Sequence, residues 1–490
     1  MEVISLILNF TPKPKVKRII SLLLAGGASD CILVGGFVRD LFLGLRSKDV
    51  DIEVYGLTYE KIFQILKRHF HVNFVGQSFG TIKVDNEIDI NIPRRESKSR
   101  VGHKGFDFLF EPNLDLHTAF SRRDFTINAI GIRCDGSIYD PFDGRNDIEN
   151  KILRAPTHEF CEDPLRVLRG MQFAARFGFT MESETVEHCK RVFNEFNTLS
   201  AERVWSEWSK WGLKGIEPSR GLFLLQETGW IQHFPEIAGL INVTKIHQTN
   251  STDKICDSEN AFVNTAKICD VAVKIADEFN FDDDERLVLI FGALCHNFGK
   301  TDLNKIDGKI DNDLSFQKMY GSISNLKSGT KFPNSVSPSL HLANQFLERF
   351  KPPLRILERV LAIVGERLTE KFVSEQCVID NVILRRLAVR LEPSCIRIWT
   401  ALCRAMILAD GNTNLIRQVD ECELRAAKLG IINSKPKPIL QGRDLVTIGV
   451  KPGREMGKIL DYAYEAQLDG IFNNIDEAII WYNNYCRDKL

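Results

Sequence analysis

The chain has 490 residues, of which 44% are hydrophobic and 26% charged, and its formal net charge is -1. These fractions are typical of soluble globular proteins and exclude a disordered, fibrous or collagen-like chain. At roughly 100–200 residues per domain, the length predicts about three domains with ample core. Because the charges nearly balance, a surface that binds nucleic acid over its whole extent is excluded, and any such binding must use local basic patches.

The chain carries no signal for a membrane or for secretion. Its longest apolar run, residues 287–295, is shorter than the roughly 18–20 residues that a membrane-spanning helix needs. The first residues, MEVISLILNFTPK, include Glu2 and no cationic leader, so a secretory signal is not expected. The twelve cysteines form no CxxC pair, which argues against a disulfide framework and a cysteine zinc site. We therefore expect a cytoplasmic protein with reduced thiols and no membrane partner.

The first 150 residues alternate between strand-like and helix-like patterns. Residues 31–34 form an apolar strand that ends at Gly35 and Gly36, a helical FVRDLFLGL follows, and residues 50–55 alternate as a strand. In residues 85–93 the isoleucines alternate with Glu87, Asp89 and Asn91, which is typical of a strand with one buried face. From about residue 153 onward a 3.6-residue periodicity replaces these signals. The predicted class is α+β, with a small mixed sheet followed by helices, and turn-rich breaks at 215–219, 308–328 and 433–438 predict boundaries between helical modules.

The first chemical motif is LVGGFVRDLFLGLRSKDVDIEVYG. Side chains alternate along a strand, so Asp49 and Asp51 are expected on the same face. Two adjacent carboxylates repel each other, and divalent cations with oxygen ligands compensate them. Gly35 and Gly36 let the backbone approach a phosphate and present N–H groups at a helix start. A solvated acidic strand is the alternative for a DxD pair alone, but the order of turn, helix and DxD favours a metal and phosphate site.

Four motifs follow one another in a recognisable order. They are VGGFVRD, KDVDIEV, RRDFTINAI at residues 122–130 and EDPLRVLRGMQFAARFGF at residues 162–179. In this order and spacing the chain resembles the class II tRNA nucleotidyltransferases and their relatives, the bacterial poly(A) polymerases. The resemblance implies a polymerase-β-like nucleotidyltransferase head with a mixed sheet, then an all-helical neck, body and tail. The expected boundaries are 1–150 for the head, 151–250 for a base-selecting and RNA-binding neck, 251–375 for the body and 376–490 for a tRNA-contacting tail.

The same resemblance implies the residues of the active site. Asp49 and Asp51 are the catalytic carboxylates that bind Mg²⁺ in a two-metal site for phosphoryl transfer. Asp89 is either a third carboxylate on the neighbouring strand or a solvent-facing acid. The implied nucleotide-binding residues are Gly35, Gly36, Arg39, Arg122, Arg123, Asp124, Asn128, Asp163, Arg166 and Arg169.

The residue types and spacing of the EDPLRVLR motif also predict a helix start and a base-selecting pair. Asp163 before Pro164 predicts a helix N-cap with proline at the first helical position, and Arg166, three residues on, is expected on the same helix face. A carboxylate accepts from an exocyclic amine and a guanidinium donates to a ring nitrogen. Cytosine and adenine share that edge, whereas uracil and guanine reverse it, so this pair would select CTP and ATP. The alternative is a cap with an i,i+3 ion pair of purely structural value.

Two further basic segments can each be interpreted either as part of the active site or as solvent-exposed charge. In RRDFTINA, Arg122 and Arg123 suit triphosphate and ribose contacts because guanidinium forks match phosphate oxygens, with Asp124 and Asn128 orienting them or contacting the ribose. A surface cluster of charges is the alternative. Residues 92–106 resemble the family's mobile loop near the active site, although a solvated charge run has the same composition. Its five basic residues are Arg94, Arg95, Lys98, Arg100 and Lys104.

The segment at residues 285–300, ERLVLIFGALCHNFGK, resembles the metal-binding helix of HD-domain phosphohydrolases. Here the His-Asp pair is His296-Asn297, and asparagine is a poor substitute for a charged metal ligand. Asn264 falls where that family has a histidine, and Phe316 and Glu366 or Arg367 fall where later histidines lie. We therefore predict an HD-like scaffold without phosphohydrolase activity. Farther on, residues 431–460 hold six basic and two acidic residues, either a phosphate-backbone contact or a solvated loop.

The favoured function is the addition of C, C and A to the 3′ end of tRNA from CTP and ATP without a template. An enzyme restricted to A, either a poly(A) polymerase or an A-adding specialist acting on RNA 3′ ends, is the runner-up. Residues 75–84 lack the double-basic stretch associated with poly(A) polymerases, which favours the tRNA enzyme. An HD-type phosphodiesterase is less well supported because its metal ligands are missing. A catalytically silent RNA-binding protein is also less well supported, because pure binding does not require Asp49, Asp51, Asp163 and Arg166, all of which are present.

Overall fold

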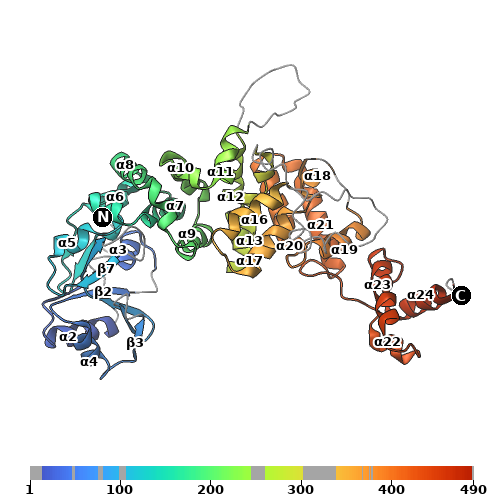
Figure 1. The fold of residues 1–490 in the computed structure, drawn as a ribbon, viewed down its shortest axis with the longest axis horizontal. Helices are drawn as coiled ribbons and strands as arrows, with labels where there is room; N and C mark the ends of the chain where they lie inside the picture. The colour runs from blue at the N-terminus through green and yellow to red at the C-terminus, as the bar shows by residue number, and fades with distance from the viewer. Residues whose placement is uncertain are drawn as a thin grey trace, which may run out of the picture. The chain divides into compact units, whose positions relative to one another are not determined.

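A computed structural model of the chain describes residues 14–46, 50–75, 81–98, 106–243, 260–301, 338–366, 368–374, 376 and 379–487. Internal contacts divide the chain into two compact units, Met1–His233 and Phe234–Leu490 (Figure 1). None of the described helices is both long enough and apolar enough to cross a membrane.

The first unit is built around a seven-stranded sheet with the strand order β3-β4-β5-β2-β1-β8-β9. The strands are β1 (Asp30–Val34), β2 (Val50–Tyr55), β3 (Val72–Val75), β4 (Thr81–Val84), β5 (Ile88–Asn91), β8 (Gly131–Arg133) and β9 (Ile138–Tyr139). Strands β2 and β5 run parallel, while every other neighbouring pair runs antiparallel. The small sheet expected from the alternating sequence pattern is therefore confirmed, and it is mixed, as the resemblance implies.

Register explains how this sheet positions the first motif. The isoleucines at 88, 90 and 92 are buried, as the alternation predicts. Asp51 on β2 lies opposite Val34, the last residue of β1, and on its other side it lies opposite Asp89 of β5. Because helix α3 (Gly35–Phe42) begins directly after Val34, the start of this helix is next to Asp51.

Helices cover this sheet and continue into the second half of the unit. Around the sheet they are α2 (Pro14–Ala25), α3, α4 (Tyr59–Leu66), α5 (Leu116–Ser121) and α6 (Gly144–Asn150). The later ones are α7 (Leu165–Phe177), α8 (Ser183–Arg191), α9 (Ala201–Lys214) and α10 (Pro218–Glu227). Helix α7 packs against both α9 and α10, and Trp208, Trp211 and Trp230 are fully buried. A Cβ at Gly221 of α10 would lie 2.7 Å from the carbonyl oxygen of Met171, so glycine permits this close helix pair.

Three details of this unit differ from the sequence prediction. A short parallel pair joins β10 (Ile152–Leu153) to β11 (Thr180–Met181), inside the part expected to be all-helical, because two-residue strands are too short to show alternation. The basic segment expected as a loop contributes β6 (Arg94–Lys98), which pairs antiparallel with β7 (Phe106–Phe110). Arg100 and Lys104 lie outside the described residues. The break at 215–219 joins α9 to α10 within one unit.

The described residues of the second unit are helical, with no β-strand among them. The helices are α11 (Pro235–Ala238), α12 (Ala261–Glu278), α13 (Asp283–Cys295), α16 (Pro338–Glu348), α17 (Leu354–Val364), α18 (Leu368–Ser374), α19 (Asn381–Arg390), α20 (Ile396–Ala409), α21 (Ile416–Lys428), α22 (Gly442–Thr447), α23 (Arg454–Leu468) and α24 (Ile475–Arg487). Helix α13 is buried on every side from Leu287 to Cys295 and contacts α12, α16, α17 and α20. An all-apolar helix of this kind forms the centre of a bundle.

The last three helices form a small core of their own. Leu440, Leu445, Met456, Ala463 and Phe472 are among its buried members. Helix α19 contacts this module through Arg386, which forms ion pairs with Glu465 and Asp469 of α23. The turn-rich break at residues 433–438 precedes the module, as the sequence suggests, whereas the break at 308–328 lies outside the described residues.

Candidate active site

Residues of three separate sequence motifs meet at Gly35, where α3 begins. Gly35 has a φ of +70°, which favours glycine. A Cβ at this position would lie 3.3 Å from Oδ2 of Asp51 and 3.6 Å from Nη1 of Arg123. The backbone turn, a carboxylate and a guanidinium are therefore direct neighbours. Asp49, the other predicted carboxylate, lies outside the described residues.

Asp89 lies beside this point but has a charge partner. It is opposite Asp51 in the parallel register of β2 and β5. Its two oxygens lie 2.7 Å and 3.1 Å from Nζ of Lys83 on β4. Lys83 thus compensates the carboxylate, which supports a paired surface acid more than a third metal ligand.

Arg39 is buried and held by protein groups on several sides. Its Nη1 donates to Oδ1 of Asn128 at 2.7 Å, and Nε and Nη2 both donate to Asp40. Its guanidinium also lies over the rings of Phe173 and Phe177 on α7. Burial lowers the pKa of Arg39, and the adjacent Asp40 opposes this effect. The nucleotide contact of Arg39 stays a prediction, and its observed contacts join α3 to α7.

The network continues from Asn128 to the neck helix. Asn128 Nδ2 donates to Oδ1 of Asp124 at 2.8 Å, and Arg169 of α7 pairs with Oδ2 of the same carboxylate at 2.6 Å. Burial alone would raise the pKa of Asp124. The positive charge of Arg169 and the hydrogen bonds from Asn128 and Arg169 outweigh burial, so the net pKa is lowered. Arg39, Asn128 and Asp124 thus form a buried chain of contacts that ends at the partly exposed Arg169.

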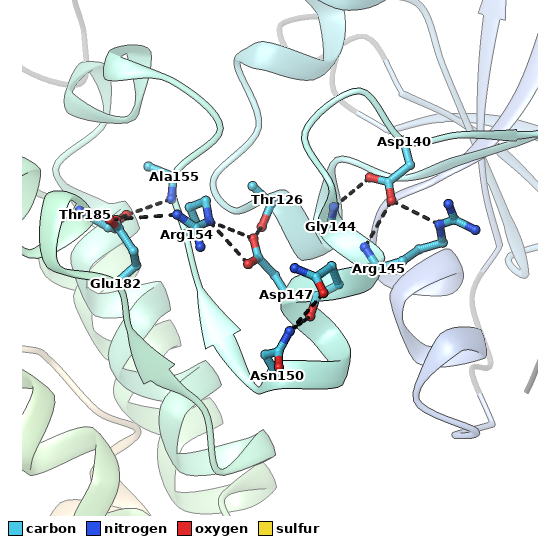
Figure 2. Close-up of polar contacts among 11 residues, drawn as sticks. Thr126, Asp140, Gly144, Arg145, Asp147, Asn150, Arg154, Ala155, Glu182 and Thr185 are labelled. Atoms are coloured by element: carbon cyan, nitrogen blue, oxygen red, sulfur yellow. Dashed lines mark hydrogen bonds and ion pairs between the residues drawn. The ribbon is translucent and has the colours of Figure 1, made fainter.

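Helix α6 contacts the segment from Arg122 to Asn128 through Thr126 (Figure 2). Thr126 Oγ1 donates to Asp147 at 2.6 Å, and Arg154 Nε donates to the same carboxylate. A Cβ at Gly144 would lie 2.2 Å from the carbonyl oxygen of Thr126, so only glycine permits this approach. These contacts fix Thr126, three residues after Arg123, to α6 and to Arg154.

The two arginines of this segment take different partners. Arg122 Nη2 donates to Glu162 at 2.6 Å, and Arg123 Nη2 donates to Glu53 at 3.0 Å. Each arginine therefore has an acidic partner, and the guanidinium of Arg123 is the one that lies beside Gly35. Glu53 was not among the sequence candidates, although in the sequence it continues the alternation of Asp49 and Asp51.

Asp163 and Arg166 lie at the start of α7, each with its own partners. Asp163 Oδ1 accepts from the backbone N–H of Leu165, as a capping side chain does, but α7 begins at Leu165 with Pro164 as its N-cap residue, one position later than predicted. Its Oδ2 accepts from Arg203 of α9 at 2.7 Å. Arg166 donates to the carbonyl oxygens of Glu159 and Arg122 at 2.7 Å and 2.6 Å. The predicted alternative of an Asp163–Arg166 ion pair is therefore wrong, because the packing of α9 on α7 supplies Arg203 instead.

The HD-like positions of the second unit carry amides instead of metal ligands. Asn264 Nδ2 donates to Oδ1 of Asp410 at 2.8 Å, and Asn297 Nδ2 donates to Thr265 at 3.0 Å. Asn264 and Asn297 are only 3% and 2% exposed. His296 Nδ1 contacts the carbonyl oxygen of Ala293.

Within the described ranges, no three or more His, Cys, Asp or Glu side chains are grouped to hold a metal ion. Glu366 pairs with Arg390, while Phe316 and Arg367 lie outside those ranges. Asp410 was missed by the sequence analysis because it lies 146 residues beyond Asn264.

Comparison with known protein families identifies two segments. Residues 31–154 match the poly A polymerase head domain, and residues 178–240 match the "Probable RNA and SrmB- binding site of polymerase A". The first segment contains Gly35, Asp51 and Arg123, and the second contains Arg203.

Curated relatives support the same grouping. The chain is 38% identical over 278 residues to the "Multifunctional CCA protein" of Pasteurella multocida, which corresponds to 55% of this chain and 62% of that protein. It is 35% identical over 275 residues to the protein of that name from Vibrio parahaemolyticus, covering 55% of this chain and 63% of the relative. The chain thus spans about three-fifths of the length of these relatives.

Solved structures extend the fold comparison to almost the whole chain. The Bacillus stearothermophilus CCA-adding enzyme in complex with CTP has a TM-score of 0.59 at 22% identity, covering 98% of this chain and 100% of that one. The Thermotoga maritima CCA-adding enzyme complexed with tRNA-CCA has a TM-score of 0.57 at 17% identity, covering 99% and 98%. The predicted arrangement of a mixed-sheet head with helices thereafter is confirmed. Over its head domain and neck segment, the chain is therefore similar to CCA-adding enzymes and poly(A) polymerases.

Proposed function

We propose that this chain is a nucleotidyltransferase that adds C, C and A to the 3′ end of tRNA from CTP and ATP without a nucleic-acid template. The observation that carries the proposal is the convergence of the Gly35 turn, Asp51 and Arg123 at the start of α3. Relatives with the same head include proteins named for CCA and structures solved with CTP or with tRNA. Those ligands belong to those proteins, and we extend them to this chain as the proposal.

The donor set at this point suits a magnesium ion. Asp51, together with Asp49, supplies carboxylate oxygens, which are the ligands that Mg²⁺ prefers. When bound there, the metal would lower the pKa of the attacking 3′-hydroxyl and neutralise the charge of the pyrophosphate leaving group. Arg122 and Arg123 bind the triphosphate through paired N–H groups, and the N–H groups at the start of α3 bind phosphate oxygens.

Asp163 and Arg166 select the base in this proposal. Each is fixed by protein contacts, so the edge that they present is rigid before a nucleotide arrives. A carboxylate has about four lone-pair positions, and the two bonds to Asp163 leave room for an exocyclic amine. Cytosine and adenine both present an amine beside an acceptor nitrogen, so both fit this edge.

The second unit and the tail serve RNA binding rather than a second reaction. Lys435, Lys437, Lys451 and Arg454 are exposed and follow the body helices, where they suit contacts to RNA phosphates. The body acts as an HD-like scaffold with no hydrolase chemistry. The scattered thiols suit a reducing compartment, so the proposal includes a cytoplasmic location.

An A-restricted enzyme is the second candidate. The head matches a model named for poly A polymerase, and the base edge proposed for Asp163 and Arg166 accepts adenine. The two candidates differ in whether C is added before A.

The test uses tRNA transcripts that end before CCA, after C and after CC, each incubated with a single labelled nucleotide. CCA addition predicts C on the first two transcripts and A on the third, whereas an A-restricted enzyme extends with A alone. Asp51→Ala should lose activity by at least about a thousandfold because a metal ligand is removed. Glu87→Gln, which changes an exposed carboxylate paired with Lys15 just before β5, is the control and should stay active. Near-normal turnover by Asp51→Ala would contradict the site.

A further inference from the structure

Three polar side chains of β2 share one face, namely Asp51, Glu53 and Tyr55. Asp51 reaches the Gly35 turn, as described above. The hydroxyl of the buried Tyr55 donates to Oε1 of Glu53. The other oxygen of Glu53 accepts from Nη2 of Arg123 at 3.0 Å. Both oxygens of Glu53 are therefore occupied by donors from the protein itself.

Arg123 is held at several points. Its Nη1 donates to the carbonyl oxygen of Asn128 at 3.4 Å, and its guanidinium lies 4.9 Å from the ring centre of Phe120. The side chains of Arg123 and Glu53 are only 18% and 12% exposed. A charged hydrogen bond that is shielded from water is stronger than a surface ion pair, so Glu53 is the main polar anchor of Arg123.

We propose that Glu53 is a positioning residue that fixes the Arg123 guanidinium beside the Gly35 turn, in the orientation that meets the nucleotide triphosphate, and that Tyr55 in turn fixes Glu53. This inference rests on the proposed function and deepens it, because it names a residue that sets nucleotide affinity. Glu53 continues the DxDxE alternation, yet its two occupied oxygens distinguish it from a metal ligand.

The physical consequence concerns binding more than chemistry. With glutamine at position 53, Arg123 loses its charge partner and samples several orientations, some directed at Asp51. A nucleotide then has to order the guanidinium as it binds, which lowers affinity. The metal ligands and the base edge are untouched, so the chemical step changes less.

The experiment measures KM and kcat for CTP and ATP with Glu53→Gln, Tyr55→Phe and the control Glu87→Gln. We expect KM to rise about tenfold for Glu53→Gln while kcat changes less than about threefold. Tyr55→Phe removes only the hydroxyl that orients Glu53, so a smaller rise of about two- to fivefold is expected. Glu87→Gln should match the wild type, and thermal melts report whether each variant is folded.

A double-mutant cycle tests whether Glu53 acts through Arg123. In an Arg123→Gln background, adding Glu53→Gln should cause no further rise in KM, because the guanidinium is already gone. Independent, multiplying effects would overturn the inference, as would an unchanged KM in Glu53→Gln while Asp51→Ala is inactive. A loss of kcat as deep as that of Asp51→Ala would make Glu53 a metal ligand and also overturn it. A wild-type protein that adds no nucleotide would refute the proposed function itself. Fluorescence titration of Mg-ATP with the same variants would then still show whether Glu53 sets nucleotide affinity.

Discussion

The candidate active site of the first unit and the HD-like positions of the second unit treat buried polar groups in different ways. At the candidate active site, buried charges are retained and paired, as in Arg39 with Asp40 and in Asp124 with the partly exposed Arg169. In the second unit, the HD-like positions carry the amides Asn264 and Asn297, which donate hydrogen bonds to Asp410 and Thr265.

This difference suggests why charged side chains are kept in the interior of one site and replaced by amides in the other. A buried charge is costly even when paired, so its retention points to a role that a neutral group cannot fill. Around Gly35 the proposed role of the arginines is to meet the negative charge of a triphosphate. An amide joins two helices by a hydrogen bond at lower desolvation cost, which suits a position whose only task is structural.

After the loss of activity expected for Asp51→Ala, the next largest effect concerns base selection in the first unit. Asp163→Ala and Arg166→Ala should each lower discrimination against UTP and GTP by about ten- to a hundredfold, because one polar contact to the base is lost. Arg166→Ala should also lower the melting temperature, since two carbonyl oxygens lose their donor. Measuring kcat/KM for all four nucleotides beside a thermal melt separates the two effects. Unchanged selectivity with a lower melting temperature would leave these residues a purely structural role.

Substitutions at the HD-like positions of the second unit should change stability and leave nucleotide addition unchanged. Asp410→Ala leaves the buried Asn264 amide without its acceptor, at a cost of about 1–3 kcal/mol in the free energy of unfolding. Urea unfolding measures this cost, and Glu421→Ala, at an exposed position of α21, is the control with little expected change. Nucleotide addition at a temperature where the variant is folded should match the wild type. A selective loss of turnover in folded Asp410→Ala would give the body a direct part in the reaction.

In the first unit, the free energy of unfolding should depend on pH through Asp124. The pKa of Asp124 is lowered in the folded protein, so the carboxylate stabilises the fold above its unfolded pKa of about 3.9. This contribution is lost as pH falls through the lower folded pKa. Asp124→Asn should therefore be less stable than the wild type at pH 7, and the difference should shrink below about pH 4. Urea midpoints from pH 3 to pH 7 test this, and a difference that stays constant with pH would contradict it.

The smallest expected effect is a null result in the body. With amides at Asn264 and Asn297, the purified protein should not hydrolyse 2′,3′-cyclic nucleotides with Mg²⁺, Mn²⁺, Co²⁺ or Ni²⁺. Product analysis by chromatography provides the measurement. Hydrolysis that disappears in His296→Ala would show that a metal centre persists in this unit.

Local patterns in the sequence predicted much of the fold and the location of the site. Alternation over residues 85–93 identified a strand with buried isoleucines, and the strand, Gly35-Gly36 turn and helix followed from neighbouring residues. These features were predictable because strand period, helix capping and glycine conformation are decided within a few residues. The hydrogen bond from Leu165 to Asp163 at the helix start was predictable for the same reason.

The partners of the site residues were decided only by the tertiary structure. Arg203 reaches Asp163 across 40 residues, Arg123 reaches Glu53 across 70, and Asn264 reaches Asp410 across 146. No local pattern specifies such pairs, because packing of α9 on α7, of strand β2 beside the 122–128 segment, and of α12 on α20 brings them together. The sequence by itself determined which residue types were available for phosphate, metal and base. The fold decided which side chain each of them meets, because a charge removed from water must find its partner among the groups that packing places beside it.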